Sequence, residues 1–270
     1  MKLKKTIKKI ISGLIPQGIY KEYIKSIWYN ILSNKKIHYG LVKRNKALIY
    51  KTKFEAFTFY TNQALYNITA DFGNYQHYYK VKKGDVIIDG GANVGLLTLL
   101  FSKIVKTQGH VFAFEPDKHN IKMLNNNFLL NEHDTNYSVH DELLWSKNTE
   151  VNFQESGTVS SSALWFSDEN CIVKKKAVML DSWCKKNNIE RLDYIKMDIE
   201  GAEIEAIEGC VEVIKKFNPN FAIASYHMVD NEPTYIKLET FFKSINYPFI
   251  TKKFSGYEII TFAGPSVLND

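Results

Sequence analysis

The chain has 270 residues, 45% of them hydrophobic, which is enough for one large core with an appendage or for two smaller cores. This composition excludes a disordered protein, and the sequence has no run of eighteen apolar residues that would predict a membrane span. The net charge of +6 is concentrated in residues 1–36, which hold nine lysines and one acid. The other 234 residues sum to −2, so the basic pI does not predict nucleic-acid binding by the main body.

Two features indicate the compartment. Cys171, Cys184 and Cys210 lack the paired spacing of a disulfide framework or a zinc site, which favours a reducing environment. The first residues lack an adequate signal-peptide apolar region. We therefore expect a cytoplasmic protein, with peripheral contact at the inner face of the membrane through residues 2–14 as a second option.

Residues 1–80 are expected to form a basic extension of helices and strands. In residues 2–14 an apolar stripe lies opposite four lysines, a pattern typical of a helix at a membrane interface and equally of a terminal helix packed on its own protein. A second helix should follow, with an apolar stripe of Tyr20, Tyr23, Ile24, Ile27, Trp28 and Ile31. Residues 37–80 are rich in Tyr, Phe and Thr, which predicts several strands or a hairpin.

The stretch from Asp85 to Glu115 predicts a cofactor site. A short apolar run at 86–88 ends at Asp89 and enters a turn that contains Gly90, Gly91 and Gly95. A helical pattern follows, and then a second strand that ends in Glu115. Glycines let backbone amides approach a ligand where a Cβ would intrude.

The acid at the end of the second strand indicates which ligand this is. Glu115 lies twenty residues beyond Gly95, where a carboxylate can accept hydrogen bonds from ribose hydroxyls, so an adenosine is expected. When the dinucleotide-binding motif G-x-G-x-x-G is aligned with Gly90 and Gly95, Ala92 occupies the position of its middle glycine. That glycine is the one that admits a pyrophosphate. S-adenosylmethionine has no phosphate, so we favour it over a nicotinamide dinucleotide.

The rest of the chain alternates strands with helices, which predicts an α/β fold with a doubly wound, mostly parallel sheet over residues 81–270. A hydroxyl-rich loop within 146–176, flanked by strands at 151–153 and 172–178, is expected to be a lid or substrate wall. The other expected helices are 117–129, 180–186, 202–216 and 234–244, and the other expected strands are 137–140, 194–199, 221–225, 249–251 and 258–262.

A group of charged residues follows the strand at 194–199. Lys196 and Asp198 are polar where a central parallel strand is normally apolar, so we expect Asp198 to act in chemistry. Glu200 and Glu203 are explained by the start of a helix, whose dipole favours acids. His227, after the next strand, is the second candidate for a general base because its ordinary pKa is about 6.5. Asp198, Glu203 and His227 could bind a metal, but the spacing does not demand one, and we assign none.

Three segments carry a resemblance to a known family. VIIDGGANVGLLTLLFSK at 86–103, FAFEPD at 112–117 and LDYIKMDIEGAEIEAIEG at 192–209 resemble the signature segments of the FkbM-type S-adenosylmethionine-dependent methyltransferases. The resemblance extends from about Lys82 to Pro248. It implies a class I, Rossmann-like methyltransferase fold with a seven-stranded sheet, and O-methylation, often of sugars of antibiotics or cell-surface glycans.

The resemblance also implies roles for individual residues. Asp198 would face the transferring methyl, with His227 as the alternative base. The turn would hold the methionine part of S-adenosylmethionine, Glu115 the ribose, and the acids after the third strand the adenine edge. The implied cofactor-binding residues are Asp89, Gly90, Gly91, Asn93, Gly95, Glu115, Asp141 and Glu142. One departure is Ser225, which stands where the family often has an acid.

The expected acceptor is a sugar or glycan, and three other functions stay open. A nucleic acid methyltransferase would suit the lysine-rich arm, but DIEG follows the fourth strand where an aromatic platform for a flipped base would stand, so no nucleic acid is expected. An NAD-dependent oxidoreductase would use the same first strand, and Ala92 argues against it. A non-catalytic scaffold of the same fold would not need the intact cofactor motifs.

Overall fold

The computed structural model describes residues 18–32, 37–44, 47–63, 68–131, 135–157, 161–164, 168–254 and 256–269. The chain divides into two compact units. One extends up to Thr69 and includes Leu129–Asn131, and the other comprises Ala70–Phe128 and Glu132–Asp270. The sequence instead places the start of the methyltransferase domain at residue 81. Each unit is described by itself.

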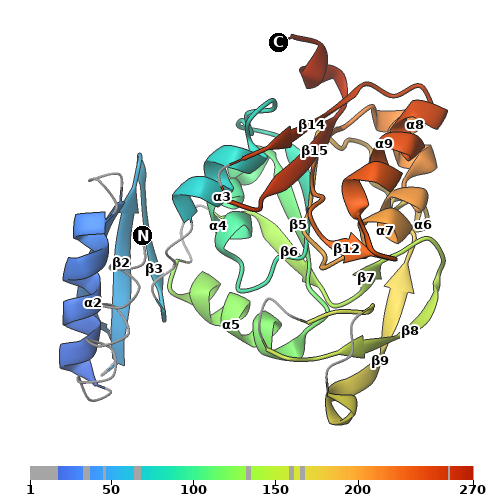
Figure 1. Ribbon diagram of the computed structural model, residues 1–270. Coiled ribbons are helices and arrows are strands. Elements are labelled where there is room, and N and C mark those ends of the chain that lie inside the picture. Colours follow the sequence, from blue (N-terminus) through green and yellow to red (C-terminus); the bar gives the residue numbers. More distant parts are fainter. Residues whose placement is uncertain are drawn as a thin grey trace. The chain divides into compact units, whose positions relative to one another are not determined.

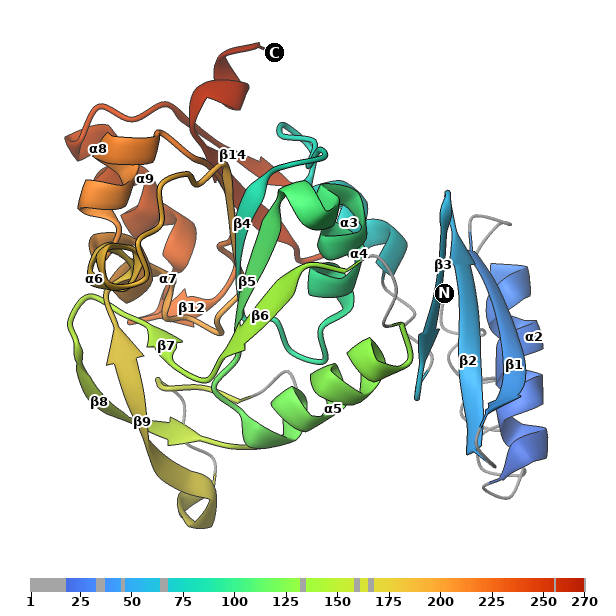
Figure 2. The ribbon, with the colours of Figure 1, turned by 180° about the vertical axis from the view of Figure 1, so that it is seen from behind.

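The smaller unit is a helix on a three-stranded antiparallel sheet. It contains α2 (Ile19–Leu32), β1 (Ile37–Arg44), β2 (Ala47–Phe54) and β3 (Phe57–Thr61), in the sheet order β1-β2-β3 (Figures 1 and 2). The Asn30 side chain both donates to the carbonyl of Tyr39 (2.9 Å) and accepts from its amide (2.7 Å), which fixes α2 to β1. The predicted second helix and the strands that follow it are confirmed.

The orientation of this helix differs from the sequence-based expectation. The predicted apolar stripe is largely exposed to solvent, whereas Ser26 is buried and donates to the carbonyl of Tyr23. Residues of the stripe that are exposed are Tyr20, Tyr23, Ile24, Ile27 and Ile31. The amphipathic segment at 2–14 lies outside the described residues. Within the described part of the chain, no helix has the length and apolar character needed to cross a membrane.

A seven-stranded sheet forms the centre of the larger unit, as predicted, in the order β14-β15-β11-β10-β4-β5-β6. The five strands from β11 to the edge strand β6 run parallel to one another. β15 is antiparallel to both of its neighbours, β11 and β14. The strands are β4 (Val86–Gly90), β5 (His110–Phe114), β6 (Tyr137–His140), β10 (Tyr194–Met197), β11 (Asn220–Ala224), β14 (Phe249–Lys253) and β15 (Ile259–Ala263). Because helices cover both faces, the central strands are buried: β10 and β11 along their whole length, and β4 and β15 at every residue but the first.

Helices cover the two faces of this sheet. Helices α3 (Ile68–Tyr75) and α4 (Leu96–Val105) lie on one side, and α6 (Leu180–Lys186), α7 (Glu203–Glu208), α8 (Val211–Phe217) and α9 (Thr234–Ser244) on the other (Figures 1 and 2). Helix α5 (Lys118–Leu129) follows β5. The single helix expected at 202–216 is wrong. α7 ends at Glu208 and α8 begins at Val211, where Asp181 accepts from the amides of Glu212 (3.0 Å) and Val213 (2.8 Å), so the two helices are separate.

The strands predicted around the hydroxyl-rich loop form a second, small sheet. It has the order β7-β9-β8, with β7 (Leu143–Leu144), β8 (Thr149–Gln154) and β9 (Ile172–Val178). β8 and β9 are antiparallel and place the described loop residues 161–164 beside them through a bridge between Gln154 and Ser162. The short elements that remain are η1 (Lys106–Gln108), η2 (Glu169–Cys171), β12 (Met228–Val229), β13 (Glu232–Pro233) and η3 (Pro265–Asn269).

Candidate active site

A pocket lies at the carboxyl ends of the parallel strands of the large sheet. It encloses about 680 Å³ of empty space, part of it open to solvent. Residues at or just beyond the ends of four strands line it, namely Gly91 after β4, Glu115 after β5, Glu142 two residues beyond β6 and Asp198 after β10. The apolar part of its wall includes Phe114, Leu143, Leu144 and Phe153. Open α/β sheets bind ligands at this edge, so the pocket is the candidate active site.

The glycine turn is packed against the end of β10. Gly91 has φ +71°, and an added Cβ there would overlap the carbonyl oxygen of Asp198. The amide of Asp198 in turn donates to the carbonyl of Gly90 (3.1 Å). Gly95 has φ +79°, and its Cβ would lie 2.6 Å from Leu124. Glycine is required at Gly91 and Gly95 because the backbone conformation and the close approach both exclude a side chain.

A buried ion pair between Lys196 and Asp89 supports this glycine turn. Lys196 Nζ lies 3.1 Å from Asp89 Oδ1, and both side chains are almost fully buried. The same ammonium donates to the carbonyls of Gly90 (3.1 Å) and Gly91 (2.9 Å). Asp89 also accepts from Thr98 (2.6 Å). The polar residue at Lys196, which the sequence analysis connected with chemistry at Asp198, therefore has a structural explanation of its own.

Glu115 lies in the pocket wall with its carboxylate held by the neighbouring backbone. It is 4% exposed, and its oxygens accept from the amides of Asn93 (2.7 Å) and Asp117 (3.0 Å) and from Asn120 Nδ2 (3.3 Å). Burial raises the pKa of Glu115, although these hydrogen bonds oppose the rise. A carboxylate offers about four acceptor positions, so capacity remains for a ligand hydroxyl.

The predicted cofactor residues fall into two groups. Gly91, Asn93, Glu115 and Glu142 line the pocket. The others do not line it: Asp89 and Gly90 lie in the buried layer beneath the turn, Gly95 packs against α5, and Asp141 is exposed. A pocket that combines a glycine turn, a buried carboxylate and an apolar wall fits the polar and apolar parts of S-adenosylmethionine.

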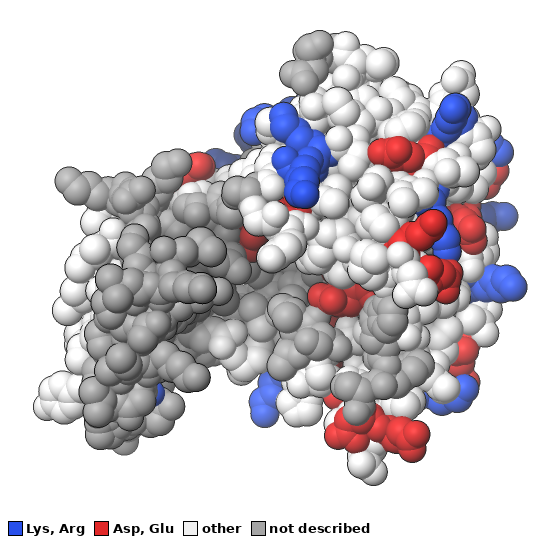
Figure 3. Space-filling model, viewed as in Figure 1, with Lys and Arg blue, Asp and Glu red and all other residues white. Residues whose placement is uncertain are grey.

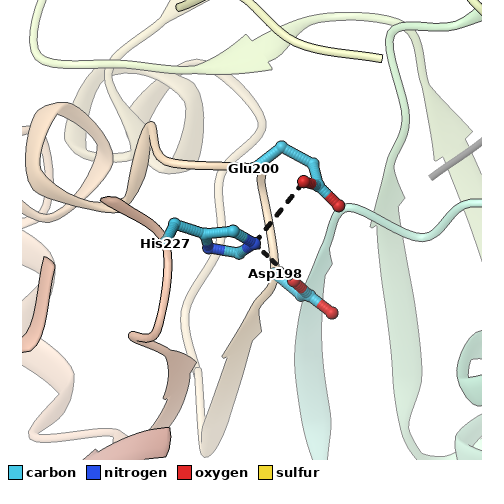
Figure 4. A group of neighbouring side chains, drawn as sticks. All are labelled: Asp198, Glu200 and His227. Carbon is cyan, nitrogen blue, oxygen red and sulfur yellow. Dashed lines mark ion pairs between the residues drawn. The ribbon is translucent and has the colours of Figure 1, made fainter. Parts of the chain in front are cut away.

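On the side of β10, carboxylates surround His227 (Figure 4). His227 Nε2 lies 3.8 Å from Asp198 Oδ1 and 3.5 Å from Glu200 Oε2. On the other edge of the ring, Nδ1 lies 3.0 Å from Glu203 Oε1. Asp198 Oδ2 accepts from the hydroxyl of Tyr75 (2.9 Å). The two candidate catalytic residues from the sequence, Asp198 and His227, are thus brought together.

These groups shift one another's protonation. Burial disfavours the charged form of His227, but the hydrogen bond and charge of Glu203, with the charges of Asp198 and Glu200, raise its pKa to about 9. Burial raises the pKa of Glu200 to about 7, and the charge of Asp198 adds to that rise. The ordinary pKa on which the base role of His227 was predicted therefore does not apply in this site.

Three residues of the site had no functional assignment from the sequence. Glu203 begins α7 but is fully buried, and it accepts from the amides of Ile199 (3.1 Å) and Gly201 (3.3 Å). Glu200 lies in the turn before that helix with φ +54°, not in the helix. Tyr75 precedes Asp198 by 123 positions and belongs to α3, so no local pattern could connect them.

Comparisons with known proteins agree with this geometry. Residues 89–249 match the family model of the methyltransferase FkbM domain. A curated relative, hexuronic acid methyltransferase AglP of Haloferax volcanii, is 24% identical over 151 residues, which are 55% of this chain. The chain spans only 58% of the length of that relative.

Two solved structures are similar to this chain, and the first of them shows the same fold. The crystal structure of methyltransferase FkbM from Methylobacillus flagellatus KT matches with a TM-score of 0.50 and 19% identity, over 66% of this chain and 43% of that chain. A putative rRNA-methylase from Clostridium thermocellum matches with a TM-score of 0.48 and 13% identity, over 75% and 97% of the two chains.

The family match covers more than half of the chain and includes the glycine turn, Glu115, Asp198 and His227. The seven-stranded sheet has the architecture that the sequence resemblance implied. The chain belongs to the FkbM family of S-adenosylmethionine-dependent methyltransferases.

Proposed function

We propose that this chain transfers the methyl group of S-adenosylmethionine to a hydroxyl of a sugar, in a glycan or a glycosylated metabolite. One observation carries the proposal: a single pocket is lined by Gly91, Asn93 and Glu115 and also by the carboxylates of Asp198 and Glu200. The first set suits the cofactor. The second set suits an acceptor that must lose a proton.

The cofactor set would bind S-adenosylmethionine through its shape and through the charge of Glu115. S-adenosylmethionine, when bound, supplies a methyl group on a positively charged sulfur. Glu115 would accept a hydrogen bond from a ribose hydroxyl, and the glycine turn would let the backbone at Gly91 approach the methionine part. Phe114 and Leu143 offer the apolar surface against which an adenine ring can pack.

The acceptor set would remove the proton from the acceptor hydroxyl. A sugar hydroxyl is a poor nucleophile until it is deprotonated, and most of the remaining acceleration comes from holding it in line with the methyl group. Asp198 is our first candidate for the base because it lines the pocket and Tyr75 fixes its orientation. Glu200 is the second, since a pKa of about 7 matches proton transfer at neutral pH.

His227 has a different task in this proposal. Its ring is held between Glu203 on one edge and Asp198 and Glu200 on the other. With a pKa of about 9 it is cationic at neutral pH and cannot accept a further proton. We assign it to the positioning of the two carboxylates.

The nature of the acceptor is supported by the curated relative, which is named as a hexuronic acid methyltransferase. That relative is distant and the match covers only 58% of its length, so we extend to this chain only the class of acceptor, a sugar.

A transfer assay tests the proposal. The full chain is incubated with methyl-labelled S-adenosylmethionine and three acceptor sets: uronic-acid oligosaccharides, neutral oligosaccharides, and RNA and DNA oligonucleotides. We expect label in the sugars, located on oxygen by mass spectrometry, and its loss in Asp198→Asn. Label in the oligonucleotides but in neither sugar set would replace the proposal by a nucleic acid methyltransferase.

A further inference from the structure

We propose that Asp198, Glu200 and His227 form a binding site for a divalent transition-metal ion such as Mn²⁺. The ion would hold the acceptor oxygen, and this part of the proposal rests on the sugar O-methylation proposed above. The site differs from the cofactor set because its three ligands come from the end of β10, the turn before α7 and the loop after β11 (Figure 4).

The separations between the side-chain atoms fit a shared metal ion. One nitrogen or oxygen atom from each of the three residues lies within 4.8 Å of the others. Ligands bound at roughly 2.0 to 2.2 Å lie about 3 to 4 Å from one another. His227 Nε2 lies 3.5 Å from Glu200 Oε2 and 3.8 Å from Asp198 Oδ1, distances that match this spacing and exceed those of hydrogen bonds.

A second observation points to a ligand at this position. The His227 side chain is only 9% exposed, and its Nε2 has no hydrogen-bond partner among the described residues. This nitrogen is aimed at Asp198 and Glu200 (Figure 4). Asp198 Oδ1 likewise has no hydrogen-bond partner there. Buried polar atoms are rarely left unpartnered, and one ion would satisfy both.

Glu203 holds the His227 ring on the edge opposite the proposed metal site. Its carboxylate lies 3.0 Å from His227 Nδ1 and is held by the amides of Ile199 and Gly201. Metal-binding histidines commonly donate their other ring nitrogen to a carboxylate, which fixes the tautomer and the ring direction. Glu203 is therefore a positioning residue that presents Nε2 to the site, and a bound metal ion would replace the proton that Nε2 carries in its absence.

The ligand set selects the kind of ion. Mg²⁺ and Ca²⁺ prefer sites made of oxygen alone, whereas an imidazole with two carboxylates suits Mn²⁺, Fe²⁺ or Zn²⁺. Three protein ligands leave coordination positions open, and Asp198 and Glu200 both line the pocket. A hydroxyl bound at such a position loses its proton more readily, and a carboxylate oxygen of Asp198 or Glu200 that the ion leaves free would accept that proton. A uronic-acid carboxylate would bind beside the hydroxyl despite the surrounding acids.

The test measures binding of Mn²⁺ alone. The full chain is stripped with EDTA, dialysed, and titrated with Mn²⁺ without cofactor, by calorimetry and by the loss of the free-Mn²⁺ electron paramagnetic resonance signal. We expect one site, and at least a tenfold weaker affinity in Asp198→Asn, Glu200→Gln and His227→Gln. Glu203→Gln should weaken binding by roughly 10- to 100-fold, as a residue behind the ligand does.

Glu258→Gln is the matched control. Glu258 is near enough for its charge to act on Asp198, but it accepts from Asn74 (2.6 Å) and lies outside the ligand set. Removing the charge of Glu258 should change the affinity for Mn²⁺ by no more than about twofold relative to the native chain. Melting temperatures show which variants are folded, and Glu200→Gln, at a partly exposed position, keeps the test valid if a buried variant unfolds.

Two results would overturn the site: no binding of Mn²⁺ or Zn²⁺ to the stripped chain, or binding that the three ligand variants leave unchanged. Sugar methylation that continues at full rate in EDTA would overturn the acceptor role of the ion. The proposed O-methylation fails by a separate result, the absence of labelled sugar in assays supplemented with Mn²⁺.

Discussion

Lys196 and Asp89 show how a single residue pair can hold the cofactor turn in place. Both are buried beneath it, and the lysine also donates to two carbonyls of the turn. Removing one partner of a buried pair leaves an uncompensated charge, which typically costs about 3 to 5 kcal/mol. We expect Lys196→Met to lower the free energy of unfolding by that amount, measured by urea denaturation.

Lys215→Met is the control for this change. Lys215 pairs with Glu212 at the surface, where both side chains are mostly exposed, so its loss should leave the unfolding midpoint almost unchanged. An unfolding midpoint of Lys196→Met equal to that of the native chain would show that the pair does not stabilise the turn.

Glu115 is the residue on which cofactor binding should depend. Glu115→Gln keeps the shape of the side chain but removes the charge that strengthens hydrogen bonds to ribose hydroxyls. We expect binding of S-adenosylhomocysteine to weaken by about 1.5 to 3 kcal/mol, measured by calorimetry. Glu150→Gln, at an exposed position in β8, should bind normally. Equal affinity in both variants would remove Glu115 from the cofactor site.

Sequence reasoning found the residues of this site that stand next to a strand end. Glu115 and Asp198 were identified because a polar residue interrupts an apolar pattern at the carboxyl end of a parallel strand. Glu203 was considered only as a possible metal ligand and received no role, because a helix start explains an acid equally well and only burial distinguishes the two cases. Tyr75 could not be predicted, since its contact with Asp198 depends on how α3 packs on the sheet.

At the scale of elements, one aspartate connects α5 to the hydroxyl-rich loop. Asp117 Oδ1 accepts from the amides of His119 (2.7 Å) and Asn120 (3.2 Å) and so caps the helix. Its Oδ2 accepts from the amide of Gly157 (2.8 Å) and the hydroxyl of Ser161 (2.6 Å). Burial would raise the pKa of Asp117, but these four donors outweigh it and lower the pKa below its ordinary value.

The lowered pKa of Asp117 determines how the stability of the protein depends on pH. A carboxyl whose pKa is depressed by folding stabilises the protein above its unfolded pKa of about 3.9, and this contribution is lost as the pH falls through the folded pKa. We expect Asp117→Ala to unfold more readily at pH 7, by about 1 to 2 kcal/mol, with a difference from the native chain that shrinks below about pH 4. Thermal unfolding over a pH series measures this.

Asp168→Ala provides the comparison, because Asp168 is exposed and caps only the short η2. It should change the melting temperature little at any pH. A difference between Asp117→Ala and the native chain that is constant from pH 7 to pH 3 would contradict the assignment of the stabilisation to the ionised carboxyl.

At the scale of elements, local sequence patterns predicted the bounds of several strands and helices, short ones included. The bounds of β6, β9, α6 and α9 agree with the sequence-based ranges. The helix at 202–216 was predicted too long because a single glycine such as Gly209 is tolerated within a helix, whereas the binding of the first amides of α8 by Asp181 is a contact that no local pattern encodes. Strands β8 and β9 were found, but their separate sheet depends on long-range pairing that no local pattern encodes.

At the scale of the whole molecule, charge is unevenly divided along the chain. Residues 1–36 carry +8 and the rest sums to −2. On the face seen in Figure 3, acidic and basic side chains of the larger unit are interspersed. The long-range attraction that a single-sign surface would exert on an anionic partner is therefore expected from the amino-terminal segment, more than from the unit that contains the pocket.

This division leads to a prediction for residues 2–14, whose sequence places an apolar stripe opposite four lysines. We propose that this segment binds anionic membrane surfaces, since each lysine near such a surface contributes about 1 kcal/mol and the stripe can enter the interface. The measurement is co-sedimentation with anionic and with neutral vesicles, for the full chain and for a chain that begins at Gln17. The full chain should sediment with anionic vesicles at low salt and be released as salt rises, because screening weakens the attraction. If the shortened chain sediments equally well, the segment is not the anchor, and the apolar stripe is better explained by packing on the protein itself.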